Sequence, residues 1–346
     1  MTRVFVALSD GLLLLQRQQG VWQAHRLLEG FPTQCLAADP LQPERLYCGT
    51  FGRGLWCSTD AGRSWHPAGE GIRSPQLMAV AVSPTERVGT WGVVYAGTEP
   101  SALYRSEDGG ASWQELSHLL TLPSAPTWSF PPRPYTSHVR AVGLDPLRAG
   151  VLVVAIEAGA LVRSFDGGQT WEDRQPGGPF DSHTLALPRQ RPGYIYSAAG
   201  DGFLQPGQGF AESHDGGTTW ERPGAGLQHH YLWGLAVDPA DPDTLVVSAA
   251  AGPQQAHNPR WAESAIYRRA GGSPWQQVLQ GMPASKGTLA SVLAAANTEP
   301  GVFYAANNQG LYRSPDAGQS WERMEIPWPE QGRRQRAESL LVLTDA

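Results

Sequence analysis

The chain repeats an eight-residue stretch whose clearest copy reads Ser164-Phe165-Asp166-Gly167-Gly168-Gln169-Thr170-Trp171. Four more copies keep the pattern Ser-x-Asp-x-Gly-x-x-Trp, and they end at Trp65, Trp113, Trp220 and Trp321. A sixth copy, residues 269–275, retains glycine and tryptophan but has lost the aspartate. Recurrence at a period of roughly 40–55 residues is typical of stacked supersecondary units, and it predicts a repeat architecture.

The residues around each copy predict four short strands, A to D, in every repeat. Before Trp171, residues 139–144 alternate, residues 151–156 form a continuous apolar run, and residues 160–164 lead into the turn. In such a turn the aspartate accepts backbone hydrogen bonds, glycine supplies a positive φ, and tryptophan covers the hairpin. We therefore interpret the motif as structural rather than catalytic.

The repeats predict an all-β fold, a seven-bladed β-propeller that forms a single domain over residues 1–346. The first blade is incomplete, because residues 4–8, 12–15 and 21–22 supply strands B, C and D but no strand A. Residues 339–343, near the other end of the chain, can supply the missing strand. This pairing would close the ring and remove its exposed edges.

Composition narrows the range of partners. A formal net charge of −6 and a pI near 5.8 argue against a nucleic-acid surface. Residues 3–6 enter a strand directly, so we expect neither a signal peptide nor a membrane partner. Cys35, Cys48 and Cys57 fall on three strands of one blade and are interpreted as buried thiols. A reducing cytoplasm is the simplest compartment for such thiols.

The Ser-x-Asp-Gly-Gly-x-x-Trp motif resembles the Asp-box, or BNR, repeat of sialidases, sortilin-type receptors, xyloglucan-cleaving enzymes and photosystem assembly factors. Over nearly its whole length the chain is similar to bacterial seven-bladed BNR proteins described as glycosyl hydrolases or sialidase-like. The resemblance implies a glycoside-type substrate. It does not imply a sialidase site, because Thr2-Arg3-Val4-Phe5 stands where sialidases carry a Phe/Tyr-Arg-Ile-Pro-like motif.

Residues able to do chemistry fall in the D–A connections and B–C loops, which open on one face of a propeller. On this rule the candidate metal ligands are His138, His183, His230 and His257. The candidate catalytic carboxylates are Glu157 and Asp201, which follow strand B of blades four and five. The longest D–A connection, residues 116–137, is rich in proline and aromatic residues and could wall a cleft. The candidate ligand-binding residues are Arg53, Trp128, Arg133, Tyr135, Arg140, Asp181, His229, Tyr231 and Asn307.

Three hypotheses follow for a site beside blades four to six. The histidines, with Glu157 or Asp201, could hold one divalent metal ion that activates water. Alternatively, Glu157 with Asp201 or Asp181 could form the acid–base pair of a metal-free glycoside hydrolase, and burial could raise the pKa of Glu157. The third hypothesis is a propeller that binds a small molecule, saccharide or partner without chemistry. We expect a hydrolase-like ligand site in which Glu157 and the histidines take part.

Overall fold

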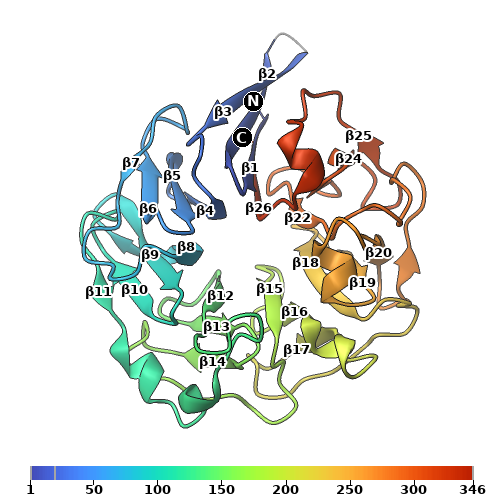
Figure 1. Cartoon of the computed structure of the whole chain (residues 1–346). Coiled ribbons are helices and arrows are strands. Elements are labelled where there is room, and N and C mark those ends of the chain that lie inside the picture. Colours follow the sequence, from blue (N-terminus) through green and yellow to red (C-terminus); the bar gives the residue numbers. More distant parts are fainter. Residues whose placement is uncertain (1, 19–20, 345–346) are drawn as a thin grey trace. The chain divides into compact units, whose positions relative to one another are not determined.

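The computed structural model describes residues 2–18 and 21–344, and it is a seven-bladed β-propeller (Figure 1). The predicted fold class is therefore confirmed. Residue contacts divide the chain into two compact units. Unit 1 holds the described residues up to Gly30, Tyr196–Glu212 and those from Glu221 onward, and unit 2 holds Phe31–Ile195 and Ser213–Trp220.

Unit 2 contains the second, third and fourth blades. The second comprises β4 (Thr33–Asp39), β5 (Gln42–Thr50), β6 (Leu55–Ser58) and β7 (His66–Pro67). The third comprises β8 (Leu77–Val88), β9 (Trp91–Thr98), β10 (Leu103–Ser106) and β11 (Gln114–Glu115). The fourth comprises β12 (Val139–Leu144), β13 (Leu152–Ile156) and β14 (Ala160–Ser164). Two 3-10 helices, η1 (Ser117–Thr121) and η2 (Ala125–Thr127), lie in the long connection between the third and fourth blades.

Unit 1 contains the first, sixth and seventh blades. The first comprises β1 (Thr2–Leu8), β2 (Gly11–Gln18), β3 (Val21–Leu27) and β26 (Ser339–Thr344). The sixth comprises β18 (Tyr231–Val237), β19 (Leu245–Ala250), β20 (Ser264–Arg269) and β21 (Gln276–Gln277). The seventh comprises β22 (Val292–Ala295), β23 (Phe303–Asn307), β24 (Gly310–Ser314) and β25 (Glu322–Arg323). Unit 1 also contains the helix α1 (Pro253–His257) and the 3-10 helices η3 (Gly200–Phe203) and η4 (Gln331–Arg334).

The fifth blade comprises β15 (Ser182–Ala186), β16 (Ile195–Ala199) and β17 (Phe210–Ser213), and the boundary between the units runs through it. Among the described residues, no helix is both long enough and apolar enough to cross a bilayer.

The first blade is closed by the strand from the far end of the sequence, as predicted. Strand β26 pairs antiparallel with β1, with Ser339 opposite Ala7 and Thr344 opposite Thr2. Val342 packs into the same buried cluster as Val4 of β1. Strand β1 therefore has a hydrogen-bonded neighbour on each side, so it is not an edge strand with unpaired backbone N–H and C=O groups.

The repeated motif forms the hydrogen bonds that its sequence predicts. Ser164 Oγ accepts the Gly168 N–H at 2.8 Å and donates to Asp166 Oδ1 at 2.9 Å. Asp166 accepts the Thr170 N–H at 2.9 Å and its hydroxyl at 2.5 Å. The Trp171 indole donates to the Gly168 carbonyl at 3.0 Å. The polar groups of the motif are thus engaged within the turn itself.

The three cysteines lie on β4, β5 and β6, and all three are buried and free of disulfides. Burial raises the pKa of the Cys35 thiol to about 12. A thiol that stays protonated at neutral pH is a poor nucleophile and a poor metal ligand, so these residues act as small apolar side chains.

Candidate functional site

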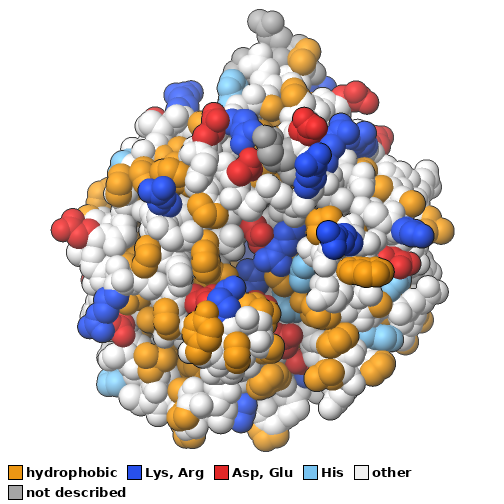
Figure 2. Space-filling model, in the orientation of Figure 1, with side chains coloured by type: hydrophobic (Ala, Val, Ile, Leu, Met, Phe, Trp, Pro, Cys, Tyr) orange, Lys and Arg blue, Asp and Glu red, His pale blue; other side chains and the backbone are white. Residues whose placement is uncertain are grey.

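Acidic and basic side chains lie among hydrophobic ones on the face seen in Figure 2, over the part of unit 2 that β12 occupies in Figure 1. The register of β12 and β13 explains part of this arrangement. Val139 is opposite Ile156, so His138 and Glu157, one residue beyond each, are the next cross-strand pair. The Glu157 N–H donates to the His138 carbonyl at 3.3 Å. Their side chains meet as well, because His138 Nε2 lies 2.9 Å from Glu157 Oε2.

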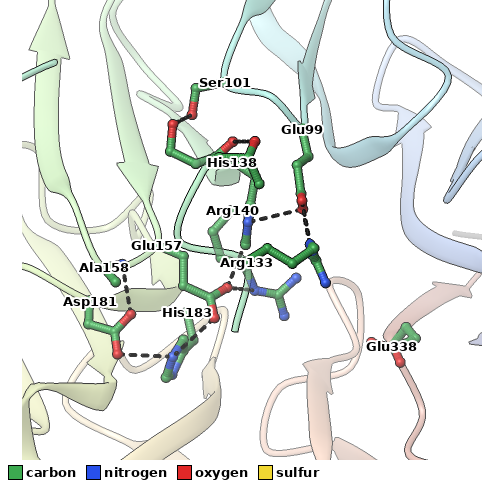
Figure 3. A network of polar contacts seen from close by, with 12 residues as sticks. Glu99, Ser101, Arg133, His138, Arg140, Glu157, Ala158, Asp181, His183 and Glu338 are labelled. Atoms are coloured by element: carbon green, nitrogen blue, oxygen red, sulfur yellow. Dashed lines mark hydrogen bonds and ion pairs between the residues drawn. The ribbon is translucent and has the colours of Figure 1, made fainter. Parts of the chain in front are cut away.

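A second carboxylate reaches the same histidine from the third blade (Figure 3). Glu99 follows β9 directly, and its Oε2 lies 3.4 Å from His138 Nδ1. Arg133, on the long connection before β12, binds Glu99 through two donors at 2.5 and 2.6 Å. Each ring nitrogen of His138 therefore faces a carboxylate. The His138 side chain is only 1% exposed, so both contacts are buried.

A third carboxylate and a second histidine come from the start of the fifth blade. Asp181 precedes β15, and its Oδ1 accepts the Ala158 N–H at 2.9 Å. His183 lies within β15, and its Nε2 is 3.6 Å from Asp181 Oδ2 and 3.9 Å from Glu157 Oε1. One ligand atom from each of these three residues lies within 4.8 Å of the other two. We call Glu99, Arg133, His138, Arg140, Glu157, Asp181 and His183 the Glu157 cluster.

The electrostatics of the cluster keep its buried carboxylates ionised. Burial alone raises the pKa of Glu157, but the hydrogen bond from His138, the nearby His183 ring and the Arg140 guanidinium outweigh it, and they hold this pKa well below its usual range. Burial likewise opposes ionisation of Glu99, yet His138 and Arg133 lower its pKa to about 2. The predicted rise in the pKa of Glu157 is therefore wrong, because the sequence does not reveal the cations placed around it.

Hydrogen bonding also raises the pKa of His138 above its ordinary value. Burial disfavours the charged ring, whereas the hydrogen bond to Glu157 and the nearby Glu99 carboxylate favour it more strongly. The doubly protonated ring can donate to both carboxylates at once. The raised pKa favours the protonated form of His138 between the two carboxylates, and a protonated ring offers no lone pair to a metal ion.

Two members of the cluster are open to a ligand. The Asp181 side chain is 23% exposed and the Arg133 side chain 35% exposed, whereas those of Glu157 and Arg140 are about a tenth exposed. The Arg133 guanidinium also lies 4.8 Å from the centre of the Phe130 ring and 5.4 Å from that of Phe51. A ligand would therefore meet Asp181 and Arg133 first.

The other candidates in unit 2 lie outside this cluster. Trp128 is buried in the core, and its indole donates to Ser124 Oγ at 2.9 Å. Trp128 was predicted to bind a ligand, but its ring packs inward and is 8% exposed. Tyr135 is 86% exposed, and Arg53 is exposed with its guanidinium 5.4 Å from the Phe31 ring centre.

In unit 1, His257 has a fixed hydrogen-bonding role. Arg336 Nη1 lies 3.1 Å from His257 Nδ1, and since arginine only donates, Nδ1 must accept. The proton is then on Nε2, which lies 3.0 Å from Tyr231 Oη. The Arg336 guanidinium also covers Trp233, 4.6 Å from its ring centre. Both ring nitrogens of His257, which was predicted to be a metal ligand, are thus engaged with Arg336 and Tyr231.

The remaining candidates of unit 1 also have partners of their own. His230 Nδ1 accepts the Gly207 N–H at 3.3 Å, His229 Nδ1 lies 2.6 Å from Tyr267 Oη, and Asp201 lies 3.6 Å from Arg222. The Gly207 contact leaves His230 only its Nε2 for a metal ion. Asn307 is fully buried, where it bonds to Ser291 and to the Gln309 N–H. The prediction that Asn307 contacts a ligand is wrong, because its amide stabilises the turn after β23.

One member of the cluster was missed from the sequence. Glu99 follows strand B of the third blade just as Glu157 follows strand B of the fourth. The rule that selected Glu157, a polar residue in a loop that follows strand B, could therefore also have selected Glu99.

Comparison with known proteins supports the repeat and the fold. Residues 162–173, which include the Asp166 turn, match the family model described as BNR/Asp-box repeat. The GH74 enzyme of Niastella koreensis has a TM-score of 0.68 at 18% identity, over 92% of this chain and 51% of that one. The structure titled YCF48 bound to D1 peptide has a TM-score of 0.61 at 16% identity, over 95% and 99%. The class is thus a seven-bladed β-propeller with BNR/Asp-box repeats, similar to GH74 propellers.

The curated relatives are xyloglucanases at low identity. Xyloglucanase Xgh74A of Acetivibrio thermocellus is 24% identical over 297 residues, which cover 72% of this chain and 32% of the relative. A xyloglucanase of Paenibacillus sp is 26% identical over 316 residues, which cover 75% and 28%. The chain therefore spans about a third of the length of these relatives.

Proposed function

We propose that this chain is a glycoside hydrolase-like propeller that acts on a saccharide at the Glu157 cluster. The similarity to xyloglucanases supports the substrate class, and the carboxylates of the cluster supply a means of cleavage. A saccharide presents hydroxyl groups, which the carboxylates and the exposed Arg133 guanidinium are suited to bind.

The observation that carries this proposal is the spacing of Glu157 and Asp181. One carboxylate oxygen of Glu157 and one of Asp181 are at most 4.8 Å apart. Retaining glycosidases hold their two carboxyl groups about 5–5.5 Å apart, and inverting enzymes hold them farther apart. The pair therefore fits a retaining mechanism better than an inverting one.

The environments of the two carboxyl groups suggest a division of labour. Glu157 is buried and held ionised, as a nucleophile must be. Asp181 is the more exposed of the two, so we assign it the role of proton donor, for which its carboxyl group must be protonated. The sequence predicts that burial raises the pKa of Glu157, which would suit a general acid. In the proposed mechanism Glu157 is instead the nucleophile, and Asp181 is the acid.

Reducing-sugar release from a panel of xyloglucan, other β-glucans and arabinoxylan tests the proposal. We expect turnover on at least one substrate, and Glu157→Gln and Asp181→Asn should each lower it at least about 100-fold. Glu107→Gln, a half-exposed carboxylate of the third-blade turn, is the control and should keep wild-type turnover. Wild-type turnover in Glu157→Gln would contradict the proposal.

Peptide binding without chemistry is the second candidate. It is favoured by the similarity to YCF48 bound to D1 peptide, which extends over nearly the whole of both chains. Arg133 could then bind a ligand carboxylate, because its guanidinium is partly exposed and held rigidly by Glu99. If no saccharide is cleaved, binding of peptides with a free C-terminus, compared with their amidated forms, distinguishes this candidate.

A further inference from the structure

We infer that Glu157, Asp181 and His183 form a binding site for a divalent first-row metal ion, with Zn²⁺ as the probe. His183 Nε2 lies 3.6 Å from Asp181 Oδ2 and 3.9 Å from Glu157 Oε1. Both distances are longer than a hydrogen bond. Ligands about 2.1 Å from a tetrahedral zinc ion are about 3.4 Å from one another. The ligand atoms of the three residues lie within 4.8 Å of one another, so the two carboxylates and the ring must move closer together to hold a metal.

The surroundings of the two carboxylates orient them toward His183 (Figure 3). Glu157 Oε2 receives the hydrogen bond from His138 at 2.9 Å, and Asp181 Oδ1 accepts the Ala158 N–H at 2.9 Å. In each carboxylate the other oxygen is the one nearest His183. Metal-binding carboxylates are commonly held in this way by hydrogen bonds from the protein.

The donor set favours a transition metal over calcium or magnesium. One imidazole nitrogen with two carboxylate oxygens suits Zn²⁺ or Mn²⁺, whereas Ca²⁺ and Mg²⁺ select oxygen ligands alone. His183 and Glu157 are buried, and the partly exposed Asp181 provides the side from which an ion can enter. Three protein ligands leave a position for water or a substrate oxygen.

This site differs from the one expected from the sequence, which combined the four histidines with Glu157 or Asp201. His183 and Glu157 are common to both. Of the other histidines, His138 lies between two carboxylates and His257 is bonded through both ring nitrogens. The inference goes beyond the proposed function, since a cation can bind without a saccharide. Because an ion bound to Glu157 and Asp181 would occupy both carboxylates assigned to cleavage, it should inhibit turnover, and metal binding is therefore tested in the absence of any saccharide.

The test is calorimetric titration of ZnCl₂, and separately MnCl₂, into protein purified without a nickel column and treated with EDTA. We expect one ion per chain, confirmed by elemental analysis after dialysis. His183→Gln and Asp181→Asn should each weaken binding at least about 10-fold. His118→Gln is the matched control, because His118 is an exposed histidine of the same unit whose Nδ1 lies 2.7 Å from the Gln169 carbonyl.

Circular dichroism checks that the variants fold, and Asp181→Asn serves as the second variant because it changes a partly exposed side chain isosterically. The absence of stoichiometric binding to the wild type would overturn the inference. Unchanged affinity in folded Asp181→Asn and His183→Gln would do the same. Cleavage assays with and without EDTA then show independently whether the ion inhibits turnover.

Discussion

At the scale of single residues, the aspartates of the repeated turns are stabilised in their ionised form. Hydrogen bonds from the Ser64 hydroxyl and N–H lower the pKa of Asp60 to about 2. The backbone N–H of Thr219 is the largest cause of a similar shift, to about 2, at Asp215. The pKa values of Asp108, Asp166 and Asp316 are lowered as well, so five turns share the effect.

These shifts predict a loss of stability in acid. An aspartate whose pKa is lower in the folded state than in the unfolded state contributes stability at pH values above its unfolded pKa, about 4. This contribution is lost as the pH falls toward the folded-state pKa, about 2. Urea unfolding at pH 5, 4, 3 and 2 should therefore show a falling free energy of unfolding. Asp60→Asn should reduce the slope between pH 4 and pH 2. A free energy that stays constant over this range would contradict the role given to the turns.

The turn of the second blade predicts a stabilising substitution. Ala61 has a φ of 65°, where the clearest copies place a glycine such as Gly167 with a φ of 75°. Because an alanine side chain is strained in this region, Ala61→Gly should raise the free energy of unfolding by up to about 1 kcal/mol. Ala111→Gly, in the third-blade turn but without a positive φ, should instead lower it by about 0.5 kcal/mol. Destabilisation by Ala61→Gly would refute this explanation.

At the scale of elements, the sequence was most informative where local pattern and structure coincide. The apolar run ending at Ile156 predicted strand β13, and the antiparallel register then placed His138 beside Glu157. His183 was expected just before a strand but lies within β15, because the ends of elements depend on neighbouring strands that one sequence does not show. The burial of Trp128 was also not predictable, because it depends on contacts with residues distant in the sequence. Its ring packs beside Gly159, on the strand-connecting turn that follows β13.

The buried position of Trp128 predicts a structural role with a large energetic effect. Trp128→Ala should lower the free energy of unfolding by about 3–5 kcal/mol, because it removes a large core side chain. Tyr135→Ala, on the same long connection but 86% exposed, should change it by less than about 0.5 kcal/mol. Chemical denaturation of both variants checks the difference. Equal effects would show that Trp128 does not anchor the connection.

At the scale of the whole molecule, the repeat determined the fold class, but it could not determine which loop residues act together. Sorting loops by face treated His138 and His257 alike, although one ring is held between two carboxylates and the other receives Arg336. Arg336 is 79 positions from His257, and nothing in the sequence links them. Cross-strand pairs were therefore predictable, whereas the hydrogen-bonded state of each histidine was not.

The central claim is that the Glu157 cluster is where a saccharide is bound. The most direct measurement is a crystal structure of the Glu157→Gln variant soaked with the best substrate of the panel. We predict that a sugar ring lies within hydrogen-bond distance of Asp181 and Arg133. A saccharide bound elsewhere on the propeller, with the Glu157 cluster free of it, would contradict the account.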